Sequence, residues 1–187
     1  ALGLPEELIE RHPFPGPGLA IRCLCSDREQ PLTRIEHGWL LPIRSVGVQG
    51  DSRSYRSVLA LPSLAPADQD LRERATALVN RLEQINRVVA WVAGRVELDK
   101  MQLTRGGLDR ERLHRLKKAD ALVRRLSQEA GFDREVWQFP VILIPIGTPD
   151  APDSVALRPV NSLDGMTAAA VMIPPELLAE MTHQLLE

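Results

Sequence analysis

The fold of this chain is constrained most strongly by a pattern of segments that occurs twice. In the first copy, the segment 41–43 (Leu-Pro-Ile) precedes a turn, an apolar strand at 57–61 and an amphipathic helix. In the second copy, the segment 144–146 (Ile-Pro-Ile) precedes a turn, a strand at 154–157 and another helix. Such a repeat predicts an α+β fold of two tandem small αββαβ-type modules, each a mostly antiparallel sheet with helices on one face.

The repeat also predicts where the modules begin and end. We expect residues 1–18 to be a linker, residues 19–94 to form the first module and residues 95–187 to form the second. In the first copy, the helix is followed by the strand Arg87–Val92. In the second copy, the chain stops at Glu187, where that strand would begin, so we expect the second module to be truncated at its C-terminus.

Individual elements are predicted from apolar spacing, prolines and capping residues. Pro42 interrupts the apolar stretch 39–48, which we therefore expect to be a bulged or edge strand that pairs with 55–61 in a hairpin. Asp109 is the expected start of the longest helix, and Gly131 is its expected end. The other expected elements are strands at 19–25, 87–92, 96–103, 139–146 and 154–160, a helix from Asp68 to about Gln84, and a helix that begins at Pro174 or Pro175.

Composition excludes several classes of function. The 187 residues include 23 Lys and Arg against 25 Asp and Glu, for a formal net charge of −2, and 44% are hydrophobic. This balance argues against a nucleic-acid partner, which requires a basic surface, and is typical of a soluble globular protein. The longest apolar runs, at 141–146 and 168–173, are too short to span a bilayer, so no membrane partner is expected.

Cys23 and Cys25 are two residues apart in an expected strand. Side chains at this spacing share one face and rarely reach disulfide geometry. The four histidines are scattered along the chain and no further ligand lies near the cysteines, so we expect no metal site. Reduced cysteines of this kind are typical of a cytoplasmic protein, which is the location that we predict.

Motifs of self-contained catalysts are missing from the sequence. It contains no phosphate-binding P-loop, no GxGxxG after a strand and no GxSxG turn. We therefore predict no catalytic residues in this chain. Taken alone, the residues favour a binding or assembly module.

Three places nevertheless have residues suited to contact a ligand. In the proline-rich loop near the N-terminus, Gly16 and Gly18 would let a ligand approach the backbone, although a stiff interdomain linker is an equal alternative. Asp51 and Arg53 lie at the expected hairpin end, where they could bind ribose hydroxyls and phosphate; an ordinary Asp-Ser turn beside a surface arginine is the alternative. Gln138 could read a purine edge or simply be a solvated residue at a strand end.

Six segments spread over the chain resemble the C-terminal domain of glutamine-hydrolysing GMP synthase. Two of them form a highly specific pair, HPFPGPGLAIR at 12–22, which lies within a longer match at 2–22, and VGVQGD at 46–51, which lies within 40–55. The doubled module is similar to the longer, vertebrate-type form of this domain. The other matching segments are INRVV (85–89), ADALVRRLSQEAGF (119–132), QFPVILIP (138–145) and SVALRPVNSLDGMTA (154–168).

The resemblance implies a role in making GMP. In that family, an ATP-pyrophosphatase domain adenylates xanthosine monophosphate (XMP), and ammonia from a glutaminase domain then displaces AMP to give GMP. The C-terminal domain helps to bind XMP and forms dimers. The implied partners are therefore XMP, the protein's own ATP-pyrophosphatase and glutaminase domains, and a second copy of the chain or an intrachain pseudo-dimer. Residues 1–18 would be the linker from a preceding ATP-pyrophosphatase domain.

The resemblance also implies specific contacts. By motif, Asp51, Arg53 and Gln138 correspond to XMP-contacting positions, and Gly16 and Gly18 belong to a loop in the same neighbourhood. We expect these residues to converge on one pocket. ATP and Mg²⁺ are the implied cofactors of the full-length enzyme, whereas none is expected in this fragment.

Two departures from the family limit these expectations. The ATP-pyrophosphatase loop, the glutaminase nucleophile and the family's terminal Lys-Pro-Pro…Glu-Trp-Glu segment do not occur in this sequence, so we expect the fragment alone to be inactive. Between Cys25 and Trp39 there is also no room for the opening helix of the first module. The alternative function is a purely architectural self-association module without a nucleotide site.

Overall fold

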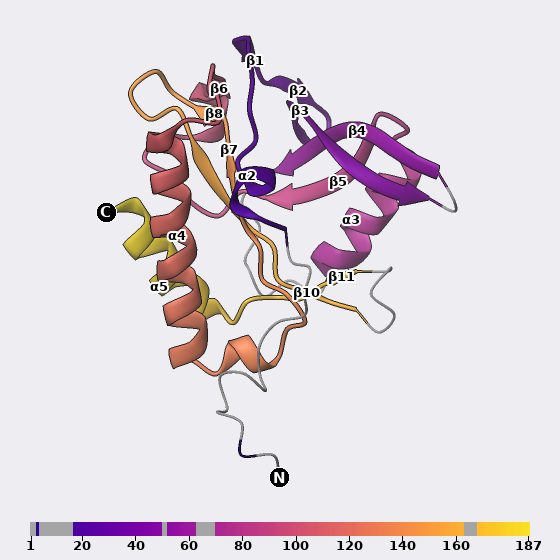
Figure 1. Ribbon diagram of the computed structural model, residues 1–187. Coiled ribbons are helices and arrows are strands. Elements are labelled where there is room, and N and C mark those ends of the chain that lie inside the picture. Colours follow the sequence, from indigo (N-terminus) through magenta and orange to yellow (C-terminus); the bar gives the residue numbers. More distant parts are fainter. Residues whose placement is uncertain (1–2, 4–16, 50–51, 63–69, 163–167) are drawn as a thin grey trace.

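The computed structural model describes residues 3, 17–49, 52–62, 70–162 and 168–187. Figure 1 shows their elements in two groups, a twisted sheet with helix α3 against it and a pair of helices, α4 and α5, that pack together. Strand β7 runs between the sheet and α4. Most strand pairs are antiparallel, which confirms the predicted α+β class.

The first group is a four-stranded sheet in the order β2-β3-β4-β5. Its strands are antiparallel except for β4 and β5, which run parallel because α3 crosses over between them. The register shifts between Leu41 and Arg44, around Pro42, as the prediction of a bulged strand required. The elements are β2 (Thr33–Ile35), β3 (Gly38–Gln49), β4 (Ser52–Leu61), α3 (Asp70–Arg81) and β5 (Ile85–Ala90). The expected cap of α3 at Asp68 lies outside the described residues.

The second group is built on the predicted long helix, α4. The carboxylate of Asp109 accepts a hydrogen bond of 2.9 Å from the backbone N–H of Arg112, which caps the helix as expected. Gly131 follows the helix with a φ of +73°, a left-handed conformation that glycine adopts most readily. The elements are α4 (Arg110–Glu129), the 3-10 turn η2 (Phe132–Arg134), β7 (Val141–Ile144), β9 (Ser154–Leu157) and α5 (Pro175–Leu186).

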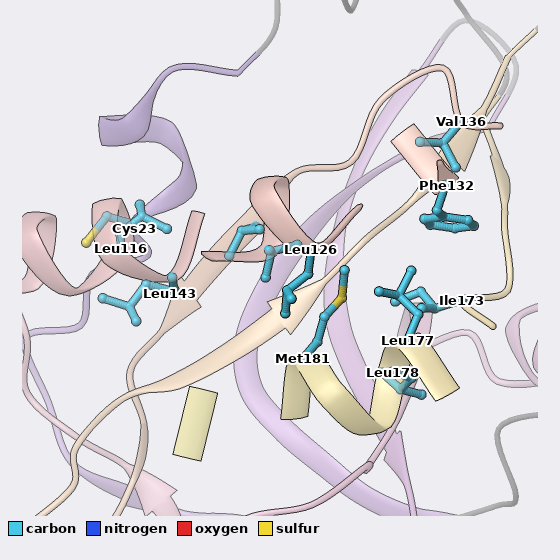
Figure 2. Close-up of a cluster of buried hydrophobic side chains, with 13 residues drawn as sticks. Cys23, Leu116, Leu126, Phe132, Val136, Leu143, Ile173, Leu177, Leu178 and Met181 are labelled. Atoms are coloured by element: carbon cyan, nitrogen blue, oxygen red, sulfur yellow. The ribbon is translucent and has the colours of Figure 1, made fainter. Parts of the chain in front are cut away.

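Helices α4 and α5 bury their apolar faces against β7 and β9 in one core, shown in Figure 2. Leu116 of α4 and Met181 of α5 are completely buried, and Phe132 meets Phe139 edge to face at 5.8 Å between ring centroids. Each such side chain contributes about 1.5–3 kcal/mol when it is removed from water. The buried members are Cys23, Leu116, Ala119, Val123, Leu126, Phe132, Val136, Val141, Leu143, Ile173, Leu177, Leu178 and Met181.

A second core joins the two groups. Val58 and Ala60 of β4 are buried with Ile146 of β8, and Ile144 of β7 packs against them. A third core, including Leu59 and Ile85, lies on the opposite face of the same sheet, which carries α3. The short strands β1 (Gln30–Pro31), β6 (Gln102–Leu103) and β8 (Ile146–Gly147) form a small sheet beside the second core.

The stretch 19–25 is not the strand that the sequence predicted. Leu19–Arg22 forms a helical turn, α2, and Cys23 then makes a parallel bridge with Leu143 of β7. The chain coils here because Arg22 turns back to donate a hydrogen bond to the carbonyl of Pro17, which a straight strand would not allow. Cys23 is consequently buried in the core of the second group.

Three other predicted strands are shorter than expected. In the stretch 96–103, the 3-10 turn η1 (Leu98–Lys100) leaves only β6 as strand. Pro145 divides 139–146 into β7 and β8 because it has no N–H; its carbonyl instead accepts from the N–H of Thr104 at 2.9 Å. The stretch 154–160 divides similarly into β9 and β10 (Val160–Asn161), which pairs with β11 (Ala169–Ala170). The module boundary at 94/95 stays a prediction.

Candidate functional site

Arg53 lies where the sequence placed it, at the end of the hairpin where the chain passes from β3 to β4. Its backbone belongs to β4 and pairs with Val48 of β3. Asp51 lies outside the described residues, as does the side-chain conformation of Arg53. In Figure 1 the paired ends of β3 and β4 project to the right, at the far end of the hairpin from α2. Convergence of this end with Gly18 therefore stays a prediction.

Two residues of β5 hold this hairpin in place, and sequence reasoning assigned them no role. The side-chain amide of Asn86 donates to the carbonyl oxygens of Ser45 at 2.8 Å and Ser54 at 3.2 Å, while the Ser45 hydroxyl donates to its amide oxygen. Next to it, Nη2 of Arg87 donates to the carbonyl of Val46 at 3.1 Å. The available clue was two polar residues near the start of an otherwise apolar strand.

The glycine loop ends against the second group. Gly16 lies outside the described residues, whereas Gly18 is the N-terminal cap of α2, and its carbonyl accepts from the N–H groups of Ile21 and Arg22. A methyl group added at Gly18 would meet no atom within 4 Å. The backbone is therefore open to a ligand here, and packing alone does not explain the glycine.

Arg22 ties this loop to the elements around it. Arg22 is only 9% exposed. Its guanidinium donates to Asp120 of α4 at 2.5 Å and to the carbonyl of Val141 in β7 at 2.9 Å. Its Nε also donates to the carbonyl of Pro17 at 3.0 Å. The structure thus brings the end of the glycine loop beside the start of β7. Sequence reasoning overlooked Arg22, although it closes the proline-glycine motif.

Gln138 precedes β7 and is fixed through its backbone. It forms an antiparallel bridge with Val160, with bonds of 3.1 Å and 2.8 Å in the two directions. Asn161 holds the preceding loop, because its side chain accepts from the N–H of Trp137 at 2.7 Å and donates to the carbonyl of Glu135 at 3.0 Å. Gln138 therefore lies three residues before Val141, whose carbonyl Arg22 binds, and its convergence with Gly18 stays a prediction.

A buried ion pair joins α4 to Asp153, the residue before β9. Arg112 and Asp153 approach to 2.8 Å with side chains 5% exposed, and Arg115 donates to the second carboxylate oxygen. Arg112 also donates to the carbonyls of Leu24 at 2.7 Å and Gly107 at 2.8 Å. Burial lowers the pKa of Arg112, but the hydrogen bond and charge of Asp153 outweigh it and raise that pKa above its usual value. These groups satisfy one another and serve the fold.

The cysteines give no sign of a metal centre. Both are free, as expected, and burial raises the pKa of the Cys23 thiol. Over the described parts of the chain, no cluster of three or more His, Cys, Asp or Glu side chains is arranged to hold a metal ion. Among the helices in those same parts, none combines the length and the apolar character needed to cross a bilayer.

Comparison with known proteins gives this geometry a context. No family model matches the chain. A protein named probable GMP synthase [glutamine-hydrolyzing] from Leptospira interrogans is 36% identical over 200 residues, which cover 100% of this chain and 33% of the relative. The whole chain is similar to a part of GMP synthase. It spans about a third of the length of this curated relative.

Further GMP synthases match with different coverage. A probable GMP synthase from Caenorhabditis elegans is 27% identical over 265 residues, covering 96% of this chain and 36% of the relative. The GMP synthase of Bdellovibrio bacteriovorus is 38% identical over 121 residues, but these cover only 47% of this chain and 24% of the relative. The worm alignment is longer than the 187 residues of this chain, so that GMP synthase has inserted residues which the chain lacks.

Proposed function

We propose that this chain is the C-terminal substrate-binding and dimerisation region of a GMP synthase, the enzyme that makes GMP from XMP, ATP and glutamine-derived ammonia. The observation that carries the proposal is the similarity to a GMP synthase over the complete chain at 36% identity. The relatives' names supply the activity, and the motifs quoted above supply the position within the enzyme. ATP, Mg²⁺ and the chemical step belong to the rest of such an enzyme.

The fold supports a role in positioning XMP. Gly18 presents open backbone beside the start of β7, and Gln138 lies three residues before the Val141 carbonyl that Arg22 binds. The hairpin that carries Arg53 is fixed by β5. A rigid frame of this kind can hold a base and a phosphate in place for attack by ammonia, because orientation alone lowers a reaction barrier substantially. Asp51, Arg53 and Gln138 are the proposed XMP contacts, with Gly16 and Gly18 beside them.

Titration of XMP into the chain by calorimetry tests the site. Arg53→Ala should weaken XMP binding by about tenfold or more, because a guanidinium makes strong, charge-assisted bonds to phosphate or carbonyl oxygens. Arg105→Ala is the matched control, since Arg105 has a side chain 73% exposed and only a 4.0 Å contact with Glu29. Equal affinity in both variants removes Arg53 from the site. Absence of saturable XMP binding by the unaltered chain overturns the proposed nucleotide site.

The self-association part of the proposal has a separate test. Each group of elements contains an antiparallel hairpin followed by a helix, β3–β4 with α3 and β7–β9 with α5. This likeness favours an intrachain pseudo-dimer. Sedimentation over a hundredfold range of concentration should then report a monomer, whereas a concentration-dependent dimer would favour the alternative, a homodimer or an architectural module.

A further inference from the structure

The contact between the two groups of elements changes from apolar to cationic along its length. At one end, Val58 and Ala60 of β4 pack with Ile144 and Ile146 from the other group. At the other end, the same facing surfaces carry Arg87 and Arg158, both half-buried.

Arg87 belongs to the side of the first sheet that faces the second group. In the β4–β5 ladder, Arg87 pairs with Val58, and Val89 pairs with Ala60. Directly paired residues share one face of a sheet, as do residues two apart along a strand. Because Val58, Ala60 and Val89 all pack in the core between the groups, Arg87 lies on that same side. Its Nη2 donates to the Val46 carbonyl, so this bond holds one side of the guanidinium.

Arg158 approaches from the opposite side. Its N–H donates to the carbonyl of Pro140 at 3.1 Å, which extends the β7–β9 ladder by one position beyond Leu157 and Val141. Val141 and Leu157 pack in the core beneath α4 and α5. Since side chains alternate along a strand, Arg158 lies on the other face, which is the face that Ile144 turns toward the first sheet.

The electrostatics agree with this placement. Burial, and then the positive charge of Arg158, lower the pKa of Arg87 to about 10. Burial likewise lowers the pKa of Arg158. Within the described residues, neither guanidinium forms an ion pair with a carboxylate. Arg87 donates one side-chain hydrogen bond, to the backbone carbonyl of Val46. Two half-buried like charges without a counter-ion are costly, so the arrangement is suited to bind an anion.

We propose that Arg87 and Arg158 form an oxyanion site between the two groups of elements, which binds phosphate or the phosphoryl group of a larger ligand. Guanidinium groups match the geometry of phosphate oxygens and can bind them in pairs. The site lies between the hairpin fixed through Val46 and the segment that contains Gln138 and Pro140. It goes beyond the proposed function, because anion binding by these two arginines does not require XMP.

The direct test is titration of the 187-residue chain with inorganic phosphate at constant ionic strength. The arginine Nε–H resonances of Arg87 and Arg158 should shift with one common saturation curve. Arg158→Gln and Arg87→Gln should each weaken phosphate binding by about tenfold, because each removes one charged partner. Arg105→Gln removes the same charge from an exposed position and should leave the affinity within about twofold.

Thermal unfolding gives an independent result that does not rely on the absolute affinity. Phosphate should raise the Tm of the unaltered chain and of Arg105→Gln, but not that of Arg158→Gln. Without phosphate, Arg158→Gln should melt at or above the temperature of the unaltered chain. Arg158→Lys is a second variant that keeps the charge and should retain part of the phosphate effect. Equal phosphate responses in Arg158→Gln and Arg105→Gln, or no saturable shift at either arginine, would overturn the site.

Competition identifies the source of the oxyanion. If the site takes the phosphoryl group of a nucleotide, XMP should shift the same two resonances and compete with phosphate, whereas xanthosine should do neither. If it takes free phosphate, phosphate should bind without competition from XMP. Phosphate binding in a chain that does not bind XMP would support this site and contradict the proposed function, so the two failures are distinguishable.

Discussion

Two of the arginine clusters in the described residues join segments that are distant in sequence, and they differ in one respect. Arg112 and Arg115 share Asp153, and the ion pair between Arg112 and Asp153 is almost completely buried. Arg87 and Arg158 lie on the two facing surfaces of the contact, and neither forms an ion pair with a carboxylate in the described part of the chain. In the first cluster the fold supplies its own counter-ion. In the second cluster, a bound ligand would supply the counter-ion.

Removal of Asp153 should have the largest effect. Asp153→Ala leaves the buried guanidinium of Arg112 without its partner, and breaking a buried pair in this way costs about 3–5 kcal/mol of unfolding free energy. Urea unfolding measures the loss. Asp150→Ala, which changes an exposed carboxylate in the same loop, should change the stability by less than about 0.5 kcal/mol. A loss below about 1 kcal/mol for Asp153→Ala would mean that the first cluster is not held by its ion pair.

Asn86 should have the next largest effect. Asn86→Ala removes the two amide bonds to the carbonyls of Ser45 and Ser54, and we expect a loss of about 1–3 kcal/mol because partly buried acceptors are left unsatisfied. Asn80→Ala, at an exposed position of α3, is the control. Hydrogen exchange should also show faster opening of the β3–β4 hairpin in Asn86→Ala. Unchanged exchange there would remove Asn86 as the support beside Arg87.

Neutralisation of Arg158 should have a small effect of opposite sign. Burial lowers the pKa of Arg158, so the folded state holds this proton less tightly than the unfolded chain does. The charged form therefore opposes folding at every pH below the folded pKa. Arg158→Gln should leave the unfolding free energy at pH 7 unchanged or raise it by up to about 1 kcal/mol. Arg112→Gln should instead be clearly destabilising, and similar losses in both variants would erase the contrast between the clusters.

The two cysteines should differ in their reactivity toward an alkylating reagent. Burial raises the pKa of Cys23 more than the charge of nearby Arg112 lowers it, so at pH 8.5 Cys23 holds its proton while exposed Cys25 reacts. Mass spectrometry after brief alkylation should find label on Cys25 first and on Cys23 only in urea. Because the folded state holds the Cys23 proton more tightly than the unfolded chain does, the folded state loses this stabilisation as the pH rises through the raised pKa of Cys23. Earlier labelling of Cys23 would show that the Arg112 charge dominates.

Local rules predicted the long elements well. The cap at Asp109, the left-handed Gly131 and the bulge around Pro42 each depend on residues close in sequence, so they could be inferred without knowing the fold. The helix at Leu19–Arg22 could not, because its apolar composition suits a strand equally well. Its shape depends on Arg22 reaching Asp120 and Val141, about a hundred residues away along the chain.

The candidate site divides in the same way. Motifs singled out Gln138 and Gly18, and the structure puts their segments beside each other through Arg22. The arginine pair went unnoticed because Arg87 and Arg158 come to lie on facing surfaces only when the two groups of elements pack together. Charge without a nearby acid in the sequence is common on any surface. Only the register and the strand faces place the two arginines on facing surfaces, and the charge of Arg158 accordingly contributes to the lowered pKa of Arg87.

The bridge from Cys23 to Leu143 has a consequence for how the chain acquires its shape during synthesis. Cys23 leaves the ribosome before Leu143, its bridge partner on β7, which is made 120 residues later. At translation rates of about 5–20 residues per second, Cys23 stays without that partner for several seconds. A protein cut between residues 94 and 95 would separate Cys23 from Leu143, so in the intact chain the segment around Cys23 can dock only after Leu143 has been made.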